Sequence, residues 1–227
     1  MNIKQALELL RNVPAAFVTD AMRRINISGY PRGIHLLHDK VDQTMVGCAV
    51  TLKYVPKQSG LKALPVPQFE AARSCKEDDI LVFAAQGSNN WLTGGNVSRV
   101  AMLQGARGLV VDGCIRDAVE LKSRATFPVY CTGTSCKPYA EDMQLVAMNE
   151  PVEFGGIMIH PGDIIVGDED GLVVIPKERL FDVIFQLEEI PDIEQRLGEA
   201  VERKDSLDVL AKISKEKQPP REKGDKN

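Results

Sequence analysis

The stretches DILVFA (residues 79–84) and GLVVD (residues 108–112) decide the fold class of this chain. Both are short, continuous apolar runs, which are typical of buried parallel strands that are covered on both faces. Between them, a glycine loop leads into a predicted helix that starts near Gly95. One side of this helix carries Val97, Val100, Ala101 and Gly105. Strand, glycine loop, helix and strand form a βαβ unit, so the sequence predicts an α/β fold.

Further strands are predicted on both sides of this unit. Residues 46–54 alternate apolar with small or polar side chains, the period of two that a half-buried strand shows. Residues 128–131, Pro-Val-Tyr-Cys, are consistent with another strand. Between residues 150 and 176, glycines and prolines separate three strand-like runs, which fit an antiparallel meander. These runs are Ile157–Ile159, Ile164–Val166 and Leu172–Ile175.

Helices are predicted towards both ends of the chain. The first twelve residues form an amphipathic pattern without the uninterrupted apolar stretch of a secretory signal. A second helix is expected to follow with Thr19 or Asp20 as its N-cap, and residues 28–45 are expected to form a loop. The last part is predicted to be helical to about Ser214, with a break at Pro191. Its core-facing stripe consists of Leu180, Val183, Ile184 and Leu187.

The sequence divides into one main domain and a C-terminal extension. Residues 1–207 are expected to form a single α/β domain, and residues 208–227 to comprise the end of the C-terminal helix and a charged tail. Residues 215–227 contain no apolar side chain able to anchor them to a core. We therefore expect disorder in that tail.

The composition indicates a globular protein and argues against several classes of partner. The chain has 227 residues, of which 44% are hydrophobic and 26% charged, enough for a packed core and a solvated surface. The net charge of -4 provides no field that would attract phosphate backbones or an anionic membrane surface. No run approaches the roughly 18 to 20 apolar residues that a membrane span needs. We expect neither a nucleic acid nor a membrane as partner.

The cysteines and histidines do not form a recognisable reactive site. The five cysteines are an odd number without a Cys-x-x-Cys pair, which predicts reduced packing thiols in a cytoplasmic protein. They are Cys48, Cys75, Cys114, Cys131 and Cys136. The three histidines, His35, His38 and His160, are expected on the surface, because an imidazole-based site would need almost all of them. The sequence also lacks the common phosphate-loop, dinucleotide, zinc-protease and nucleophile-elbow motifs.

Two segments at the ends of the predicted strands are candidates for binding and catalysis. Gly94-Gly95-Asn96-Val97 opens a helix, where exposed backbone N–H groups favour a carboxylate or phosphate. Arg116 supplies a fork of donors suited to a carboxylate, and Asp117 supplies hard oxygen for Mg²⁺ or a similar ion. Since ligands of open α/β sheets bind at the carboxyl ends of the strands, the two segments predict an anionic-substrate and metal site.

An ordinary structural interpretation is also open for both segments. The glycine pair is compatible with a simple tight turn. Asp117 is compatible with a helix cap, and Glu120, three residues later, would complete a capping box.

The order and spacing of these residues resemble the signature of the RraA-like family. Gly95, twenty intervening residues, Arg116-Asp117, two residues and Glu120 carry the likeness. The family includes the class II 4-hydroxy-4-methyl-2-oxoglutarate/4-carboxy-4-hydroxy-2-oxoadipate aldolases. Three further segments agree in order: residues 20–21, 111–113 and 161–176. The likeness covers roughly residues 15 to 207.

This resemblance implies a swivelling β/β/α sandwich, similar to phosphohistidine domains, with C-terminal helices. It also implies homotrimers or homohexamers with active sites at subunit interfaces. In the family's aldolases, the loop matching Gly94–Val97 holds the 2-oxo acid through backbone amides, and the arginine matching Arg116 contacts its oxygens. The aspartate matching Asp117 binds a divalent cation, Mg²⁺ or Mn²⁺. A carboxylate from a neighbouring subunit's C-terminal helix lies near the metal waters, and Glu194 is its best match in this chain.

One position departs from the family's aldolases. They carry an aspartate where this chain has Gly95, and its absence removes a group for proton transfer or for positioning a water. The family's regulators of RNase E, by contrast, lack the intact Arg-Asp pair. The presence of Arg116-Asp117 therefore favours a working metal site.

We expect a metal-dependent carbon–carbon lyase that acts on 2-oxo acids through a pyruvate enolate. Retro-aldol cleavage of 4-hydroxy-2-oxo acids and decarboxylation of oxaloacetate share that intermediate, and the sequence does not choose between them. The alternative is a non-enzymatic oligomeric regulator of a ribonuclease. A methyltransferase is disfavoured, because the chain has no glycine-rich nucleotide loop followed by an acidic ribose ligand.

Overall fold

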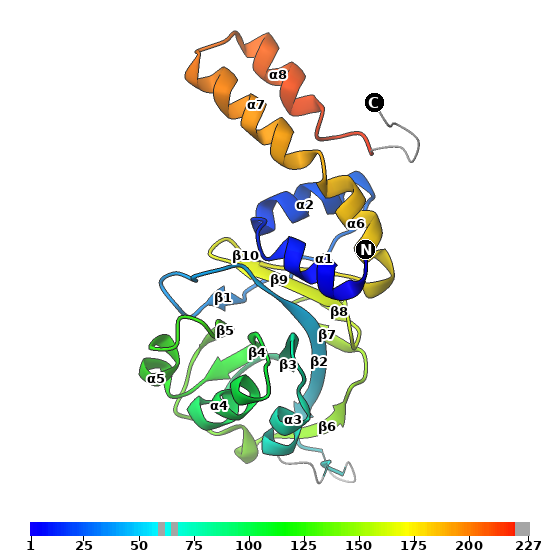
Figure 1. Ribbon diagram of the computed structural model, residues 1–227. Coiled ribbons are helices and arrows are strands. Elements are labelled where there is room, and N and C mark those ends of the chain that lie inside the picture. The colour runs from blue at the N-terminus through cyan, green and yellow to red at the C-terminus, as the bar shows by residue number, and fades with distance from the viewer. Residues whose placement is uncertain (59–61, 65–67, 221–227) are drawn as a thin grey trace.

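A mixed sheet organises the protein, with helices packed against it (Figure 1). The computed structural model describes residues 1–58, 62–64 and 68–220, and within these residues the sheet has eight strands. They are β1 (His35–Leu36), β2 (Met45–Pro56), β3 (Asp79–Thr93), β4 (Gly108–Ile115), β5 (Val129–Thr134), β6 (Met143–Met148), β9 (Ile164–Asp168) and β10 (Gly171–Ile175). Their order is β1-β5-β4-β3-β2-β9-β10, and β6 pairs with β2.

Within the described residues, six helices pack against the sheet, and two more follow at the C-terminal end of the chain. They are α1 (Ile3–Leu10), α2 (Ala15–Arg24), α3 (Gln68–Ser74), α4 (Gly95–Leu103), α5 (Ala118–Lys122), α6 (Leu180–Leu187), α7 (Ile190–Glu202) and α8 (Leu207–Lys215), with short 3-10 turns at Tyr139–Glu141 and Lys177–Arg179. In Figure 1, α3, α4 and α5 lie against the central strands, while α1, α2 and α6 cover β9 and β10. The helices α7 and α8 form a hairpin that extends away from the sheet.

The predicted βαβ unit is confirmed. Strands β2, β3, β4 and β5 pair in parallel, and all eight residues of β4 are buried. Helix α4 begins at Gly95, the predicted start. Strand β3 continues nine residues beyond the predicted run, to Thr93, with three register shifts against β4. This irregular extension carries the chain across the carboxyl ends of β4 and β5.

Two other strand predictions need correction. The runs at residues 157–175 do not form one meander: β7 (Val152–Phe154) and β8 (Ile157–Ile159) are a separate antiparallel pair. Strands β9 and β10 form a second hairpin, and β9 joins the main sheet through β2. The segment 28–45 is not entirely loop, because His35 and Leu36 pair with β5. Two residues are too short a run for a periodic signal.

The predicted start of the second helix is also wrong. Helix α2 begins at Ala15, with Pro14 as its N-cap residue, so neither Thr19 nor Asp20 caps it. The Oδ2 atom of Asp168 accepts a hydrogen bond from the backbone nitrogen of Ala15, at 2.7 Å. The capping carboxylate comes from β9, far away in the sequence, which local capping rules do not detect.

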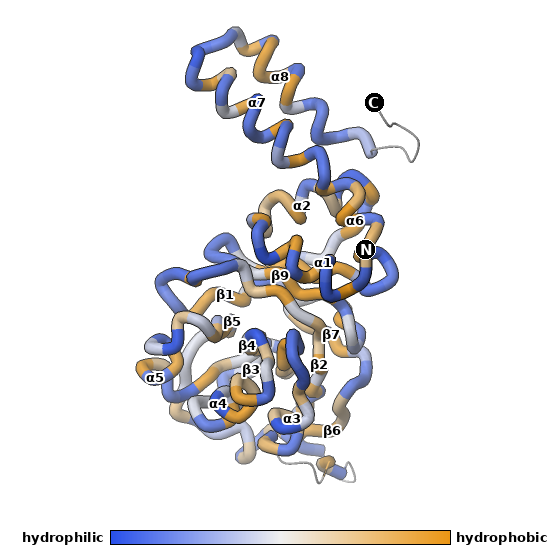
Figure 2. The backbone as a smooth tube through the Cα atoms, in the orientation of Figure 1, coloured by the Kyte–Doolittle hydropathy of each residue, from blue (hydrophilic) through white to orange (hydrophobic). Residues whose placement is uncertain are grey.

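Three groups of buried apolar side chains form the core. One, around Phe83 and Leu109, lies between the sheet and α3, α4 and α5. A second, around Met22 and Ile184, lies under α1, α2 and α6, and a third surrounds Phe154 between the sheet and the β7–β8 pair. Figure 2 shows hydrophobic residues along the interior strands, whereas α7 and α8 carry both kinds.

The C-terminal helices agree with the sequence in most respects. The stripe of four apolar residues on α6 is buried, and Pro191 lies in the first turn of α7. None of the residues of α8 is buried. Arg24, whose side chain is 1% exposed, donates hydrogen bonds to the carbonyls of Gln186, Glu216 and Lys217 and thereby ties this end to α2. The expected disorder is wrong for the first part of the tail, residues 215–220, which the structure describes: Glu216 pairs with Arg196, and Lys217 pairs with Glu194. Residues 221–227 of the tail lie outside the described residues.

The side chains that were expected to be unreactive divide into two groups. All five cysteines are free thiols; Cys75, Cys114 and Cys131 are buried as predicted, but Cys136 is exposed and is not a packing residue. His35 and His160 are exposed, whereas His38 is buried and its Nε2 atom lies 2.9 Å from the carbonyl oxygen of Leu121. The surface prediction for His38 is therefore wrong, because α5 covers it.

Across the described chain, no helix is long and apolar enough to cross a membrane.

Candidate active site

The structure brings the two predicted segments together at the carboxyl ends of β3 and β4. The backbone nitrogen of Gly95 donates a hydrogen bond to Oδ2 of Asp117, at 3.0 Å. The backbone nitrogen of Arg116 donates to the carbonyl oxygen of Thr93, at 3.1 Å. A Cβ atom on Gly94 would lie 2.6 Å from Oδ2 of Asp117, so glycine is required there for this close approach. The loop before α4 and the turn after β4 thus form one structural unit.

Asp117 has an unusual backbone conformation. Its φ of 60° and ψ of 35° place it in the left-handed region, where aspartate and asparagine are tolerated better than most residues. It is the N-cap residue of α5, as the structural interpretation expected, but its side chain makes no capping hydrogen bond to that helix. The capping-box interpretation is therefore wrong. The strained backbone directs the carboxylate across to Gly95 instead, and strain of this kind often marks a functional position.

Arg116 lies beside this carboxylate with most of its donors available. Its Nε atom is 3.6 Å from Oδ2 of Asp117, too long for a good hydrogen bond, and its side chain is 49% exposed. Its Cζ atom lies 4.0 Å from the centre of the Trp91 ring. Among the described residues, no side chain or carbonyl accepts a hydrogen bond from its terminal Nη groups. The guanidinium is thus free to bind an anionic ligand.

The start of α4 supplies further donors. Gly94 precedes the helix without any side-chain cap, and the first N–H groups of a helix have no acceptor within it. Asp117 accepts from the N–H group of Gly95, which leaves those of Asn96 and Val97 as the first-turn donors. Gly94, Gly95 and Val97 are buried, while Asn96 is exposed. The start of α4 and Arg116 both approach the Asp117 carboxylate, since the Gly95 nitrogen and the Nε atom of Arg116 lie 3.0 and 3.6 Å from the same Oδ2 atom.

Glu120 takes a position that sequence reasoning did not assign to it. A Cβ atom on Gly95 would lie 2.6 Å from Cδ of Glu120, so the glutamate carboxylate occupies the space beside Gly95. The φ of Gly95 is not positive, which means that this glycine is needed for space and not for backbone freedom. The carboxylates of Asp117 and Glu120 thus both approach Gly95.

Arg124 holds Glu120 in place, and sequence reasoning missed it. Its Nη2 atom pairs with Oε1 of Glu120, and its Nη1 atom donates to the carbonyl oxygen of Gly95 at 3.1 Å and to Oγ of Ser98 at 3.0 Å. The spacing of four residues between Glu120 and Arg124 is the signal that could have found this pair, although Arg124 lies two residues beyond the end of α5.

A pocket of about 470 Å³ opens next to these groups. It is lined by Trp91, Ile115, Arg116, Asp117, Ala118, Thr134, Ser135 and Cys136. Sequence reasoning identified Arg116 and Asp117 but missed Trp91 and the segment after β5. Both reach the site through the irregular pairing at the ends of β3, β4 and β5.

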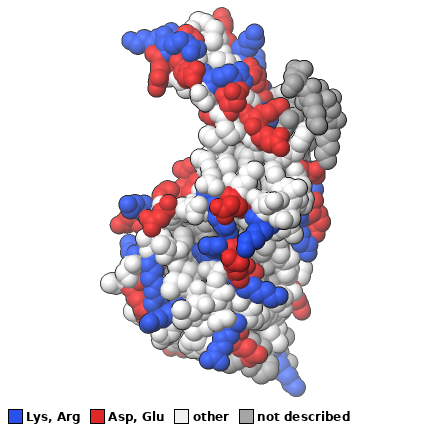
Figure 3. Space-filling model, viewed as in Figure 1, with Lys and Arg blue, Asp and Glu red and all other residues white. Residues whose placement is uncertain are grey.

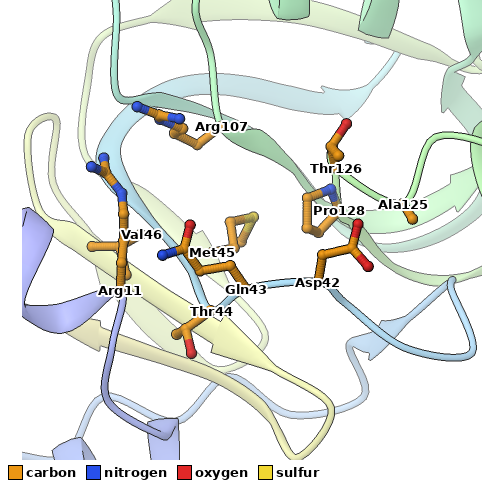
Figure 4. A pocket seen from close by; sticks show the side chains of 10 residues that line it. All are labelled: Arg11, Asp42, Gln43, Thr44, Met45, Val46, Arg107, Ala125, Thr126 and Pro128. Carbon is orange, nitrogen blue, oxygen red and sulfur yellow. The ribbon is translucent and has the colours of Figure 1, made fainter.

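A separate pocket lies near the amino ends of the parallel strands and contains none of the predicted site residues (Figure 4). Its two arginines are neutralised within the protein. Nη2 of Arg11 and Nε of Arg107 lie 2.6 and 2.7 Å from the same Oδ1 atom of Asp78, and Nη1 of Arg11 lies 2.6 Å from Oε2 of Glu8. This pocket is therefore part of a structural ion-pair network.

The donor set at Asp117 suits a hard divalent cation only in part. Within residues 1–58, 62–64 and 68–220, no group of three or more His, Cys, Asp or Glu side chains could hold a metal ion by itself. Mg²⁺, however, keeps several waters and commonly takes only one or two carboxylates together with substrate oxygens. Asp117, with Glu120 nearby, fits an ion of that kind.

Glu194, the candidate from a neighbouring subunit, lies far from this site within its own chain. It is on α7, where it pairs with Lys217. In Figure 1, β9 and β10 separate α7 from α4 and α5. A role across a subunit interface stays a prediction. So does the absence of a nucleic-acid partner, although the face seen in Figure 3 carries interspersed acidic and basic side chains.

Comparison with known proteins supports the family and the fold. A protein of Halalkalibacterium halodurans named "Putative 4-hydroxy-4-methyl-2-oxoglutarate aldolase" is 32% identical over 202 residues, which cover 88% of this chain and 89% of that protein. An uncharacterized protein of Methanocaldococcus jannaschii is 39% identical over 118 residues, and the chain spans only 56% of its length. The crystal structure of Streptomyces coelicolor RraAS2, "an unusual member of the RNase ES inhibitor RraA protein family", has a TM-score of 0.75 and 27% identity, covering 89% of this chain and 97% of that one.

The match to RraAS2 supports a mixed α/β fold with C-terminal helices, and the finer swivelling β/β/α classification stays a prediction. The family model "RraA-like: Aldolase/RraA" matches residues 15–174, which include both segments of the candidate site. The chain therefore belongs to the RraA-like family.

Proposed function

We propose that this protein is a divalent-metal-dependent carbon–carbon lyase that acts on 2-oxo acids. The observation that carries the proposal is the left-handed Asp117, whose carboxylate lies between an available guanidinium and the start of α4. The name of the relative from Halalkalibacterium halodurans, "Putative 4-hydroxy-4-methyl-2-oxoglutarate aldolase", specifies a 2-oxo acid, and this set of donors suits such a substrate.

The substrate's 2-oxo carboxylate would be bound by this chain's own donors. Arg116 offers a planar pair of N–H groups, and the first-turn amides of Asn96 and Val97 offer backbone donors in a region of positive potential. Together they orient C3 and C4 of the substrate towards the pocket bordered by Trp91 and Ser135. Orientation of this kind lowers the entropic part of the barrier.

Asp117, with Glu120 beside it, would hold the cation. The cation, Mg²⁺ or Mn²⁺, would supply Lewis-acid stabilisation of the negative charge that develops on the keto oxygen as the C3–C4 bond breaks. Arg116 stabilises the same charge from the protein side. The electron pair of the broken bond stays on the three-carbon fragment, which takes up a proton at C3 to give pyruvate.

The two candidate reactions differ in their need for a base. Retro-aldol cleavage must remove a proton from the C4 hydroxyl, whereas decarboxylation of oxaloacetate releases CO₂ without that step. Of the pocket's lining residues, only Asp117 carries a carboxylate, and it is assigned to the cation. This favours decarboxylation of oxaloacetate as the main activity, with aldol cleavage as the second.

The experiment is a pyruvate-release assay on oxaloacetate and a panel of 4-hydroxy-2-oxo acids. Each substrate is measured with Mg²⁺, with Mn²⁺ and after exhaustive chelation, and Asp117→Asn serves as the matched inactive variant. Metal-dependent release that is lost in the variant supports the proposal. Release by the wild type that survives chelation, or no release from any substrate, contradicts it.

A regulatory role is the second candidate, because the structure is similar to a member of an RNase ES inhibitor family. Binding of a ribonuclease by protein–protein contact, independent of metal and retained in Asp117→Asn, would favour that role. Absence of such binding, together with metal-dependent pyruvate release, would exclude it.

We also propose that the chain forms homotrimers or homohexamers. Large apolar side chains are exposed beside the site at Val119 (88%), at the far end of α4 at Leu103 (72%) and on α8 at Leu207 (82%). Their burial between subunits would account for this exposure. Light scattering on the purified protein gives the subunit number, and a monomer at micromolar concentration would contradict the proposal.

A further inference from the structure

Trp91 is held rigidly at the edge of the candidate site. Its backbone nitrogen donates a hydrogen bond to the carbonyl oxygen of Lys137 at 2.8 Å, and Trp91 also forms an isolated bridge with Pro138. The Trp91 and Tyr139 rings meet edge to face, with centroids 5.9 Å apart and planes at 83°. The ring is therefore fixed from the segment that follows β5 as well as from β3.

Arg116 rests on the face of this fixed ring. Its Cζ atom lies 4.0 Å from the ring centre, well within the range of a cation–π contact. The ion pair with Asp117, at 3.6 Å, is too long to set the guanidinium's orientation. A stacked guanidinium contacts the ring with its face and keeps the N–H groups in its plane available for a carboxylate.

We propose that Trp91 is a positioning residue that holds Arg116 in the orientation needed for bidentate binding of the substrate carboxylate. The identity of that ligand rests on the proposed function, but the stacking does not. Without the ring, a half-exposed arginine would sample many rotamers and bind the carboxylate in only a few of them. A cation–π contact at such an exposed position corresponds to about a two- to fivefold change in affinity.

The first experiment tests the stacking without any ligand. Trp91 is the only tryptophan in the chain, so intrinsic fluorescence reports on this position alone. Acrylamide quenching should increase in Arg116→Ala, by up to about twofold, because one of the two ring faces loses its cover. The control is Arg99→Ala, which removes an exposed arginine on α4, and it should leave the quenching constant unchanged. An unchanged constant in Arg116→Ala overturns the proposal.

The second experiment tests whether Trp91 acts through Arg116. Calorimetric titration with oxalate, a non-reacting mimic of a 2-oxo carboxylate, is carried out with Mg²⁺ on wild type, Trp91→Leu, Arg116→Ala and the double variant. Trp91→Leu should weaken oxalate binding about two- to fivefold when Arg116 is present. It should have no effect in the Arg116→Ala background, because the effects of two substitutions are not additive when one residue acts through the other. Trp91→Phe should recover part of the loss.

The outcomes separate this inference from the proposed function. Equal losses from Trp91→Leu in both backgrounds would show that Trp91 acts independently of Arg116, and would overturn the proposal. Wild-type protein that does not bind oxalate contradicts the proposed function. In that case the quenching experiment still decides whether Trp91 holds Arg116.

Discussion

Replacing Gly95 with alanine is expected to lower activity while changing stability very little. Gly95 is the first residue of α4 and does not have a positive φ, so alanine fits the backbone and gains up to about 1 kcal/mol in helix propensity. The new Cβ would lie 2.6 Å from Cδ of Glu120, and the carboxylate must retreat by roughly 1 Å to reach ordinary contact.

That retreat weakens the pair between Glu120 and Arg124, whose side chains are 46% and 16% exposed, and a partly exposed ion pair of this kind contributes up to about 1 kcal/mol. The two contributions to stability oppose each other. The net change in the free energy of unfolding should therefore stay within about 1 kcal/mol of zero.

The loss of activity should be much larger. A carboxylate positioned next to a metal ligand typically affects metal affinity or activity by about 10- to 100-fold, so Gly95→Ala and Glu120→Ala should each reduce metal-dependent pyruvate release by such a factor. Because both changes remove the same carboxylate from the same place, Gly95→Ala should cost almost nothing further in the Glu120→Ala background.

The assay is the initial rate of pyruvate release over a range of Mg²⁺ concentrations, so that losses in metal affinity and in turnover are both seen, with thermal unfolding measured on the same samples and Arg99→Ala as the control on α4. Gly95→Asp in the Glu120→Ala background restores a carboxylate at this place and should recover activity. The ratio of aldol cleavage to decarboxylation in this double variant tests whether the carboxylate also serves proton transfer. If Gly95→Ala lowers the rate by the same factor with and without Glu120, the reasoning about space is refuted.

Four further substitutions have defined outcomes. Asp117→Asn keeps a residue type that tolerates the left-handed backbone, so the melting temperature should not change. Metal-dependent turnover should fall by at least about 100-fold, and turnover equal to wild type would contradict the metal assignment. Arg116→Lys should be nearly as damaging to kcat/KM as Arg116→Ala, because lysine lacks the planar pair of donors. Arg24→Met should destabilise the protein by about 3 kcal/mol, because three carbonyls lose a buried charged donor. It should also accelerate amide exchange in residues 190–217, and unchanged exchange there would show that Arg24 does not anchor the α7–α8 hairpin. Thr93→Val should stabilise the fold by about 1 kcal/mol in chemical denaturation, because the buried Thr93 hydroxyl has no partner among the described residues.

The sequence by itself determined the parts of this protein that depend on short-range patterns. The apolar runs at residues 79–84 and 108–112, the start of α4 at Gly95 and the stripe on α6 are all local signals, and each is present in the structure. The predicted βαβ unit has parallel strands, so the segments that follow its two strands, which contain Gly95 and Asp117, were expected at the same edge of the sheet. The structure has these two residues in hydrogen-bond contact there.

Only the tertiary structure decided how the site is assembled. The irregular continuation of β3 brings Trp91 onto Arg116, and α5 turns Glu120 onto Gly95, where Arg124 holds it. The carboxylate that caps α2 comes from Asp168, in a distant strand. Periodicity and capping rules describe which face of an element is buried and where it begins, but they contain no information about β-bulges or about side chains that meet after the chain has packed. Such contacts become defined only when the elements come together.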